Sequence, residues 1–319
     1  MKVLITGGSG FIGSYLCKHL LDQGHEVSSL DDFSTGDRRN IADLENTKGF
    51  RSKEGSILDK ELVKTLIAGV DTCFHFAAAV GVQKIIDDPI GSLETNLHGS
   101  ENVIKACSEN RVELILASSS EIYGKNTAQP LTEDSDRVIG SPLLSRWTYS
   151  EAKAIDEALA HAYHSRHGLK MKIARLFNTV GPGQSPAFGM VIPRFFAAAL
   201  ANKDLEIHGD GSQRRVFCHV EDAVGGVIGL WRHADGNGQA FNIGGSQETS
   251  ILELAQRIIQ ITNSRSNVNF IPYARLRSQG FEDMQRRVPS TEKLEKLTGW
   301  IPKKSLDEIL FDYLFSVKE

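Results

Sequence analysis

The first thirteen residues, MKVLITGGSGFIG, constrain the fold of this chain more than any other stretch. Residues 2–6 form a short apolar run, which predicts a buried strand. Gly7, Gly10 and Gly13 follow it, and apolar residues then recur with helical spacing as far as Gly24. Strand, glycine turn and helix in this order predict a dinucleotide-binding turn. Its glycines permit a tight bend, close approach of a pyrophosphate to the backbone, and close packing of the helix on the sheet.

An acidic residue ends the next predicted strand, which spans residues 26–30. Asp31 lies 18 residues beyond Gly13 (31 − 13). A carboxylate at this position can accept hydrogen bonds from the hydroxyl groups of the adenosine ribose, and it repels a 2′-phosphate. The sequence therefore predicts NAD rather than NADP as the bound dinucleotide.

Predicted strands and helices alternate through the first half of the chain, which indicates an α/β fold with a doubly wound parallel sheet. We expect a Rossmann domain over residues 1–178 and a smaller, mainly substrate-binding C-terminal domain over residues 179–319, from which a later strand and helix could return to the first domain. Further strands are predicted at residues 50–54, 72–78, 114–118 and 170–176, and helices at 59–67, 89–110 and 147–167.

Composition argues against several classes of protein. The chain of 319 residues has a net charge of −4 and no basic block, so no nucleic-acid partner is indicated. No apolar run approaches the ~20 residues that span a membrane. The chain also enters its first strand without a signal peptide, and we expect a cytoplasmic protein. No C-x-x-C occurs and no metal site is predicted, because the four cysteines are scattered at Cys17, Cys73, Cys107 and Cys218.

Two further segments contain groups suited to acid–base chemistry. Tyr149 and Lys153 are four residues apart in a predicted helix, so they project from the same face. A lysine ammonium and a positively charged nicotinamide ring would both lower the pKa of the tyrosine from about 10 towards neutrality. Residues 118–121, SSSE, follow a predicted strand, and ligands bind at the carboxyl ends of strands in doubly wound sheets. A serine hydroxyl there could share a substrate hydroxyl with Tyr149.

With these features, the chain resembles the extended short-chain dehydrogenase/reductase family, and more narrowly its nucleotide-sugar epimerases, dehydratases and decarboxylases. The resemblance runs from about Lys2 to about Tyr313. It implies an NAD-dependent enzyme that acts on a UDP-sugar and forms a homodimer through helices beginning near Pro89 and Trp147. The matching segments are TGGSGFIGS, DDFSTG, FHFAA, SSSEIYG, YSEAK, RLFNTVGP, GDGSQRRVF and FNIGG.

The resemblance also implies roles for individual residues. The implied catalytic residues are Ser119, Glu121, Tyr149 and Lys153. At Ser56 the family often has an aspartate that contacts the adenine. The implied substrate-binding residues are Arg146, Asn178, Arg215 and Arg287. The implied cofactor-binding residues are Gly7, Gly10, Phe11, Ile12, Gly13, Asp31, Asp32, Ser34, Ser56, Ile57, Ala77, Ala78, Ser118, Tyr149 and Lys153.

Three of these residues separate the reactions known in the family. The set of Glu121, Arg146 and Arg287 resembles the UDP-glucuronate decarboxylases, whereas 4-epimerases usually have a small or polar residue at the position of Arg146. The 4,6-dehydratases have an aspartic acid where this chain has Ser120, and apiose synthases tend to have a cysteine there. The substrate of these decarboxylases, UDP-glucuronate, has a carboxylate at C6. An arginine is suited to bind it, because a guanidinium binds a carboxylate through charge-assisted hydrogen bonds.

We therefore expect decarboxylation of UDP-glucuronate to UDP-xylose or to its 4-keto pentose, through a transient 4-keto sugar. The alternative is a UDP-sugar 4-epimerase acting on the glucose/galactose or glucuronate/galacturonate pair. A 4,6-dehydratase and a non-catalytic sugar-nucleotide sensor fit less well. Simpler roles also stay open: Arg287 could clamp the pyrophosphate, Arg146 could be structural, and Glu121 could be the ion-pair partner of either arginine.

Overall fold

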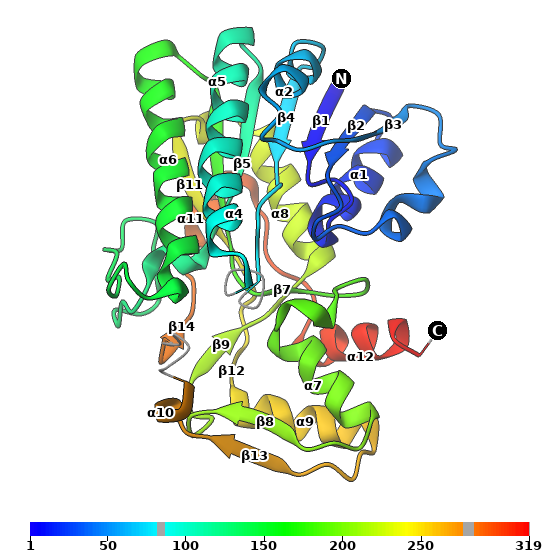
Figure 1. Ribbon diagram of the computed structural model, residues 1–319, viewed down its shortest axis with the longest axis vertical. Coiled ribbons are helices and arrows are strands. Elements are labelled where there is room, and N and C mark those ends of the chain that lie inside the picture. Colours follow the sequence, from blue (N-terminus) through cyan, green and yellow to red (C-terminus); the bar gives the residue numbers. More distant parts are fainter. Residues whose placement is uncertain (82–86, 277–283, 319) are drawn as a thin grey trace.

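The computed structural model describes residues 1–81, 87–276 and 284–318 (Figure 1). Its upper part contains a seven-stranded sheet in the order β11-β6-β5-β4-β1-β2-β3. All strand pairs in this sheet are parallel, which confirms the predicted doubly wound α/β fold. The strands are β1 (Lys2–Thr6), β2 (Glu26–Asp31), β3 (Phe50–Glu54), β4 (Thr72–His75), β5 (Glu113–Ser119), β6 (Met171–Leu176) and β11 (Gln239–Ile243).

Helices cover both faces of this sheet, because its central strands are apolar on both sides. Along β1, Val3 and Ile5 pack towards one hydrophobic core and Leu4 towards the other, and all three are fully buried. The first core is closed by α1 (Phe11–Asp22), α8 (Val220–Arg232) and α11 (Glu292–Thr298). The second is closed by α2 (Lys60–Ile67), α5 (Ser100–Asn110) and α6 (Thr148–His167).

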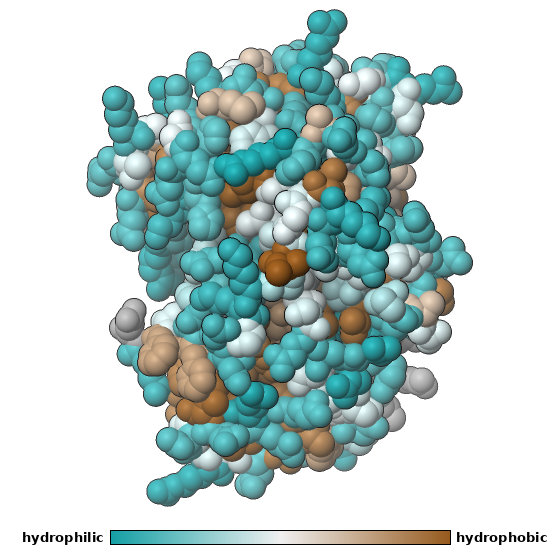
Figure 2. All heavy atoms as spheres, turned by 180° about the vertical axis from the view of Figure 1, so that it is seen from behind, coloured by the Kyte–Doolittle hydropathy of each residue, from teal (hydrophilic) through white to brown (hydrophobic). Residues whose placement is uncertain are grey.

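The lower part of Figure 1 has a separate core, built from α7, α9, α12 and β8. Short sheets lie around it in the orders β12-β9-β14, β13-β8 and β10-β7. Figure 2 shows the opposite side of the molecule, where hydrophilic residues predominate. The elements are β7 (Thr179–Val180), α7 (Val191–Leu200), β8 (Leu205–His208), β9 (Arg214–Val216), β10 (Cys218–His219), β12 (Glu248–Ser250), α9 (Ile251–Thr262), β13 (Val268–Ile271), α10 (Tyr273–Leu276), β14 (Arg286–Arg287) and α12 (Leu306–Ser316).

The second half of the chain returns to the upper sheet. β11 pairs with β6 at the sheet edge, and α8 and α11 pack in one of the upper cores. The boundary after residue 178 stays a prediction.

The helix predicted over residues 89–110 is interrupted in its middle. It consists of α4 (Pro89–Glu94), a π-helical turn over Thr95–Gly99, and α5. Asn96, within that turn, accepts a hydrogen bond from the Ala79 amide (2.8 Å) and donates one to the Ala79 carbonyl (3.0 Å). The strand predicted over residues 72–78 ends earlier, at His75, because the residues after it form a loop tied to this turn. Within the three described ranges, no helix is long and apolar enough to cross a membrane.

Candidate active site

A cleft of about 980 Å³ opens at the carboxyl ends of the sheet strands. This volume is at the upper end of the range for small-molecule sites, which suits two large ligands side by side. Residues from both parts of the molecule line it. Among the predicted site residues, its walls include Gly7, Gly10, Phe11, Ile12, Gly13, Asp31, Asp32, Ser34, Ile57, Ala77, Ala78, Ser118, Ser119, Glu121, Arg146, Tyr149, Lys153, Asn178 and Arg287.

The glycine turn between β1 and α1 is closely packed. Gly7 has a φ of +74°, and a Cβ atom placed on it would lie 2.7 Å from the backbone nitrogen of Ala77. A Cβ atom on Gly13 would lie 2.0 Å from the carbonyl oxygen of Gly7. Glycine is therefore required at both positions, and the exposed backbone beside the start of α1 can face a pyrophosphate directly.

The carboxylate of Asp31 is held by backbone groups at the end of β2. It accepts hydrogen bonds from the amides of Ser9 (2.8 Å) and Phe33 (2.9 Å). Burial raises the pKa of Asp31, and these two amide bonds oppose the rise. Each carboxylate oxygen has a second lone pair, which can accept a bond from a ribose hydroxyl. The exposed Asp32 accepts a bond from the Ser34 amide (2.9 Å), so it shapes the same turn.

Tyr149 and Lys153 both reach the cleft from α6, as their spacing predicts. The Lys153 side chain is only 2% exposed, and its ammonium lies 3.3 Å from the carboxylate of Asp156. Burial raises the pKa of Tyr149 above its ordinary value of 10.0, while the charge of Lys153 lowers it. The predicted lysine contribution is therefore present. The expectation of a near-neutral tyrosine is not met by the protein's own groups, because burial and the carboxylates of Glu121 and Asp156 outweigh it.

The two serines at the end of β5 have separate environments. Ser119 accepts a hydrogen bond at Oγ from the Glu121 amide (3.3 Å), which leaves its hydroxyl hydrogen able to donate to a ligand. Ser118 is buried, and its Oγ has no hydrogen-bond partner within the described residues. A buried hydroxyl without a partner is costly, so Ser118 is suited to meet a bound cofactor.

Glu121, Arg146 and Arg287 form one cluster, which we call the arginine–glutamate triad. Arg287 donates from Nη1 to one oxygen of Glu121, and Nη1 of Arg146 lies 2.6 Å from the other. Burial alone would raise the pKa of Glu121, but the charges of the two arginines hold it well below its usual range. With Glu121 ionised, the triad has a net charge of +1 (2 − 1).

Arg287 also makes contact beyond Glu121. Its Nη2 donates to Oδ1 of Asn178 (2.7 Å), and the Asn178 amide in turn donates to the carbonyl of Val216 (2.7 Å). Within the described residues, the buried Nε of Arg287 has no hydrogen-bond partner. This cation therefore keeps one N–H group that a ligand in the cleft could use.

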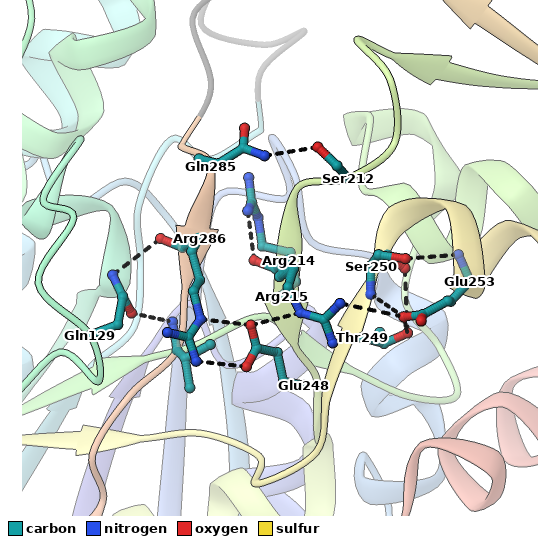
Figure 3. Close-up of polar contacts among 11 residues, drawn as sticks. Gln129, Ser212, Arg214, Arg215, Glu248, Thr249, Ser250, Glu253, Gln285 and Arg286 are labelled. Atoms are coloured by element: carbon teal, nitrogen blue, oxygen red, sulfur yellow. Dashed lines mark hydrogen bonds and ion pairs between the residues drawn. The ribbon is translucent and has the colours of Figure 1, made fainter.

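Neighbouring residues fix the two arginines of the triad. Arg146 lies against the buried ring of Trp147, with 5.2 Å between its Cζ and the ring centroid. Arg287 belongs to β14, in which the other residue, Arg286, pairs with Glu248 of β12 (2.7 Å; Figure 3) and is not among the residues that line the cleft. Successive residues of a strand point to opposite sides, so the Arg286–Glu248 pair on one side directs Arg287 to the other.

Two predicted site residues do not line the cleft. Ser56 accepts a hydrogen bond at Oγ from the Leu58 amide (3.2 Å) in the turn before α2. Arg215 is buried and donates from Nη1 to the carbonyl of Arg214 (2.8 Å; Figure 3). Their roles stay predictions. Asn96, which the sequence motifs did not single out, does not line the cleft either, and it ties the loop after β4 to the π-helical turn through its two bonds with Ala79.

Comparison with known proteins agrees with this geometry. Residues 3–244 match the family described as "NAD dependent epimerase/dehydratase family". The chain belongs to this NAD-dependent family. It is 38% identical to a UDP-N-acetyl-alpha-D-glucosaminuronate decarboxylase of Bacillus cytotoxicus over 96% of this chain and 94% of that protein. It is 35% identical to UDP-glucuronic acid decarboxylase 1 of Danio rerio over 96% of this chain and 70% of that protein.

Solved structures of the epimerase/dehydratase family share the whole fold. A UDP-glucuronic acid 4-epimerase from Bacillus cereus, solved with UDP-glucuronic acid and NAD, superposes with a TM-score of 0.90. It is 28% identical, and the match covers 100% of this chain and 99% of that chain. The resemblance drawn from the sequence motifs is thus confirmed at the level of family and fold.

The residues of the cleft fit NAD. The turn at Gly7 and Gly13 is too tight for any side chain, Asp31 has free lone pairs, and the buried Ser118 hydroxyl has no partner within the described residues. In this family, NAD supplies the acceptance and return of a hydride. The glycine turn would hold its pyrophosphate, Asp31 its adenosine ribose, and Ser118 would lie in the inner part of the cleft.

Proposed function

We propose that this chain is an NAD-dependent UDP-hexuronate decarboxylase, with UDP-glucuronate as the expected substrate and UDP-xylose or its 4-keto pentose as the product. The observation that supports this most is the net positive charge of the arginine–glutamate triad, which lies beside the start of the helix bearing Tyr149. A partly buried positive charge favours a sugar with a C6 carboxylate over a neutral hexose.

Tyr149 begins the reaction by removing the proton of the C4 hydroxyl as C4 is oxidised to a ketone. Ser119 donates a hydrogen bond to the same substrate oxygen. The charge of Lys153 stabilises the tyrosinate that this role requires. A tyrosine of raised pKa is mostly protonated near neutral pH, so its use as a base depends on the positive charges collected around it.

Arg146 or Arg287 holds the C6 carboxylate until CO₂ leaves. Once C4 is a ketone, the sugar is a β-keto acid, and the electrons of the breaking C5–C6 bond delocalise into that ketone. Glu121 keeps the two guanidinium groups in place, and in this proposal it also orients the water or proton that reaches C5. Return of a hydride to C4 then gives the pentose, unless the 4-keto sugar is released first.

A second candidate function is 4-epimerisation of the same uronate, since the compared Bacillus cereus epimerase was solved with UDP-glucuronic acid. A positive triad would suit that substrate as well. Two relatives at 38% and 35% identity are named decarboxylases, and this supports carbon loss over epimerisation.

The deciding experiment incubates the NAD-loaded protein with UDP-glucuronate and follows CO₂ release and the product by NMR and mass spectrometry. UDP-N-acetylglucosaminuronate is tested in parallel, because a relative is named for it, and Tyr149→Phe is the inactive control. We expect CO₂ and a UDP-pentose. UDP-galacturonate as the sole product, or conversion of UDP-glucose to UDP-galactose with the uronates untouched, would show that the decarboxylase proposal is wrong.

The proposal includes a homodimer and a cytoplasmic location. Ile90 on α4 and Ile155 on α6 are 71% and 52% exposed, and burial of such side chains against a second copy would be favourable. The cysteines are free and buried, as suits a reducing compartment. Sedimentation of the purified protein tests the dimer.

A further inference from the structure

A carboxylate outside the predicted site contacts the lysine within it. Asp156 lies one turn beyond Lys153 on α6, and both side chains are 2% exposed. Its Oδ2 lies 3.3 Å from the lysine ammonium and accepts a second hydrogen bond from Ser100 of α5 (3.0 Å). A buried ammonium without a counter-charge loses its proton readily, because burial disfavours the charged form.

The contact continues as a chain of buried hydrogen bonds towards the glycine turn. Nε2 of His75, at the end of β4, lies 3.0 Å from the Ser100 oxygen, and its Nδ1 lies 2.7 Å from the hydroxyl of Thr6, the last residue of β1. The Ala77 amide donates to the same Thr6 oxygen (3.3 Å). The chain therefore ends beside Gly7, where the cofactor turn begins.

The direction of each bond in this chain follows from its two ends. Ser100 gives its hydrogen to Asp156, so its oxygen accepts from Nε2 of His75. The other ring nitrogen then accepts from Thr6, whose oxygen is left to accept the Ala77 amide. Burial, with a smaller contribution from the charge of Lys153, lowers the pKa of His75 to about 3, and the ring is neutral as this pattern requires. Every donor points towards Asp156, as suits an ionised carboxylate.

Titratable and polar groups on three elements surround this pair. On α6, Glu157 follows Asp156 but bonds to Arg175 (2.7 Å), and Tyr149 is within the field of both Lys153 and Asp156. α5 and β4 contribute the neutral Ser100 and His75. In the part of the chain that the structure describes, Asp156 is the carboxylate paired with Lys153.

We infer that Asp156 is a positioning residue of this site: its carboxylate keeps the ammonium of Lys153 charged beside Tyr149, and Ser100 and His75 tie that carboxylate to the cofactor turn. The inference rests on the proposed acid–base role of Tyr149. It does not depend on which UDP-sugar is converted, or on whether CO₂ is lost.

The test is a spectroscopic titration of Tyr149 in the NAD-loaded protein without substrate, so failure of the proposed reaction cannot affect it. Tyrosinate absorbance is followed against pH, and the same titration of Tyr149→Phe is subtracted. In Asp156→Asn, Lys153 should lose its proton before Tyr149 does. The midpoint of Tyr149 should then rise, by less than the about 1–3 pH units expected for loss of one adjacent positive charge, because the smaller raising effect of the Asp156 charge is lost as well. An unchanged or lower midpoint overturns the inference.

Further variants separate this role from general effects. Glu151→Gln is the control on the same helix, because the Glu151 carboxylate pairs with Arg137 at the surface (3.1 Å). This variant should leave the Tyr149 midpoint unchanged. In a Lys153→Met background, Asp156→Asn should cause no further rise, and a rise there would show that Asp156 does not act through the lysine. Ser100→Ala keeps the carboxylate but removes its hydrogen bond. This milder variant should raise the midpoint by less than Asp156→Asn, and no rise at all would overturn the proposed tie to α5.

Discussion

Replacement of Arg287 by methionine should weaken binding of UDP-glucuronate far more than binding of UDP. The substitution removes a guanidinium whose side chain is only 10% exposed and lowers the charge of the triad from +1 to zero. It also removes the N–H at Nε that has no partner within the described residues. A hydrogen bond between charged groups contributes about 1.5–3 kcal/mol. The dissociation constant for UDP-glucuronate should therefore rise roughly 10- to 150-fold.

The assay is calorimetry on the NAD-loaded protein in a Tyr149→Phe background, which prevents turnover during the titration. Arg286→Met is the matched control, because Arg286 is the adjacent residue and pairs with Glu248 away from the cleft. We expect it to change either affinity by a factor of about two or less. Equal weakening of UDP and UDP-glucuronate by Arg287→Met would assign Arg287 to the pyrophosphate. No weakening of either ligand would refute a substrate role for the triad.

Three further outcomes follow from the site. Tyr149→Phe should lower kcat by about 10²–10⁴-fold, the usual contribution of proton transfer, with NAD affinity retained in calorimetry; preserved turnover would remove Tyr149 from the mechanism. Asp31→Ala should lower the affinity for NAD while that for NADP stays constant or improves, and parallel losses would contradict its ribose role. Burial lowers the pKa of His75 from 6.5 to about 3, so its contribution to stability is full above pH 6.5 and is lost as the pH falls. Between pH 6.5 and about pH 5, the free energy of unfolding should fall by about 2 kcal/mol because of His75 alone. Urea unfolding of His75→Gln should show a decrease that is smaller by this amount over the same pH range.

The cofactor part of the site could be predicted from sequence because its determinants are local. Gly7, Gly10 and Gly13 lie within one turn, and Asp31 ends the next strand. Glycines at this spacing indicate the backbone geometry, since only glycine at position 7 allows its backbone to lie so close to that of Ala77. The alternation of strands and helices likewise determined the sheet class, although it could not place β11 at the sheet edge.

The pairings within the cleft were beyond prediction, because they join distant segments. Helical spacing places Asp156 on the same face as Lys153, but it does not say that this face is buried against α5. The sequence left open whether Glu121 pairs with Arg146 or with Arg287, and the structure pairs it with both. The burial that raises the pKa of Tyr149 was likewise beyond prediction, since burial depends on the assembled fold.

The long separation of the triad's members affects how the protein is made. Glu121 and Arg287 are 166 positions apart, and closing a flexible loop of that length costs about 4.5 kcal/mol in chain entropy. A chain emerging from the ribosome therefore completes the glycine turn, β2 and α6 well before Arg287 exists. In the first part of that interval, until β11 has been made, β6 lacks this neighbour and exposes an unpaired sheet edge. The nascent protein should thus acquire a place for its cofactor first and a place for its substrate last, and chaperones are most needed between these two stages.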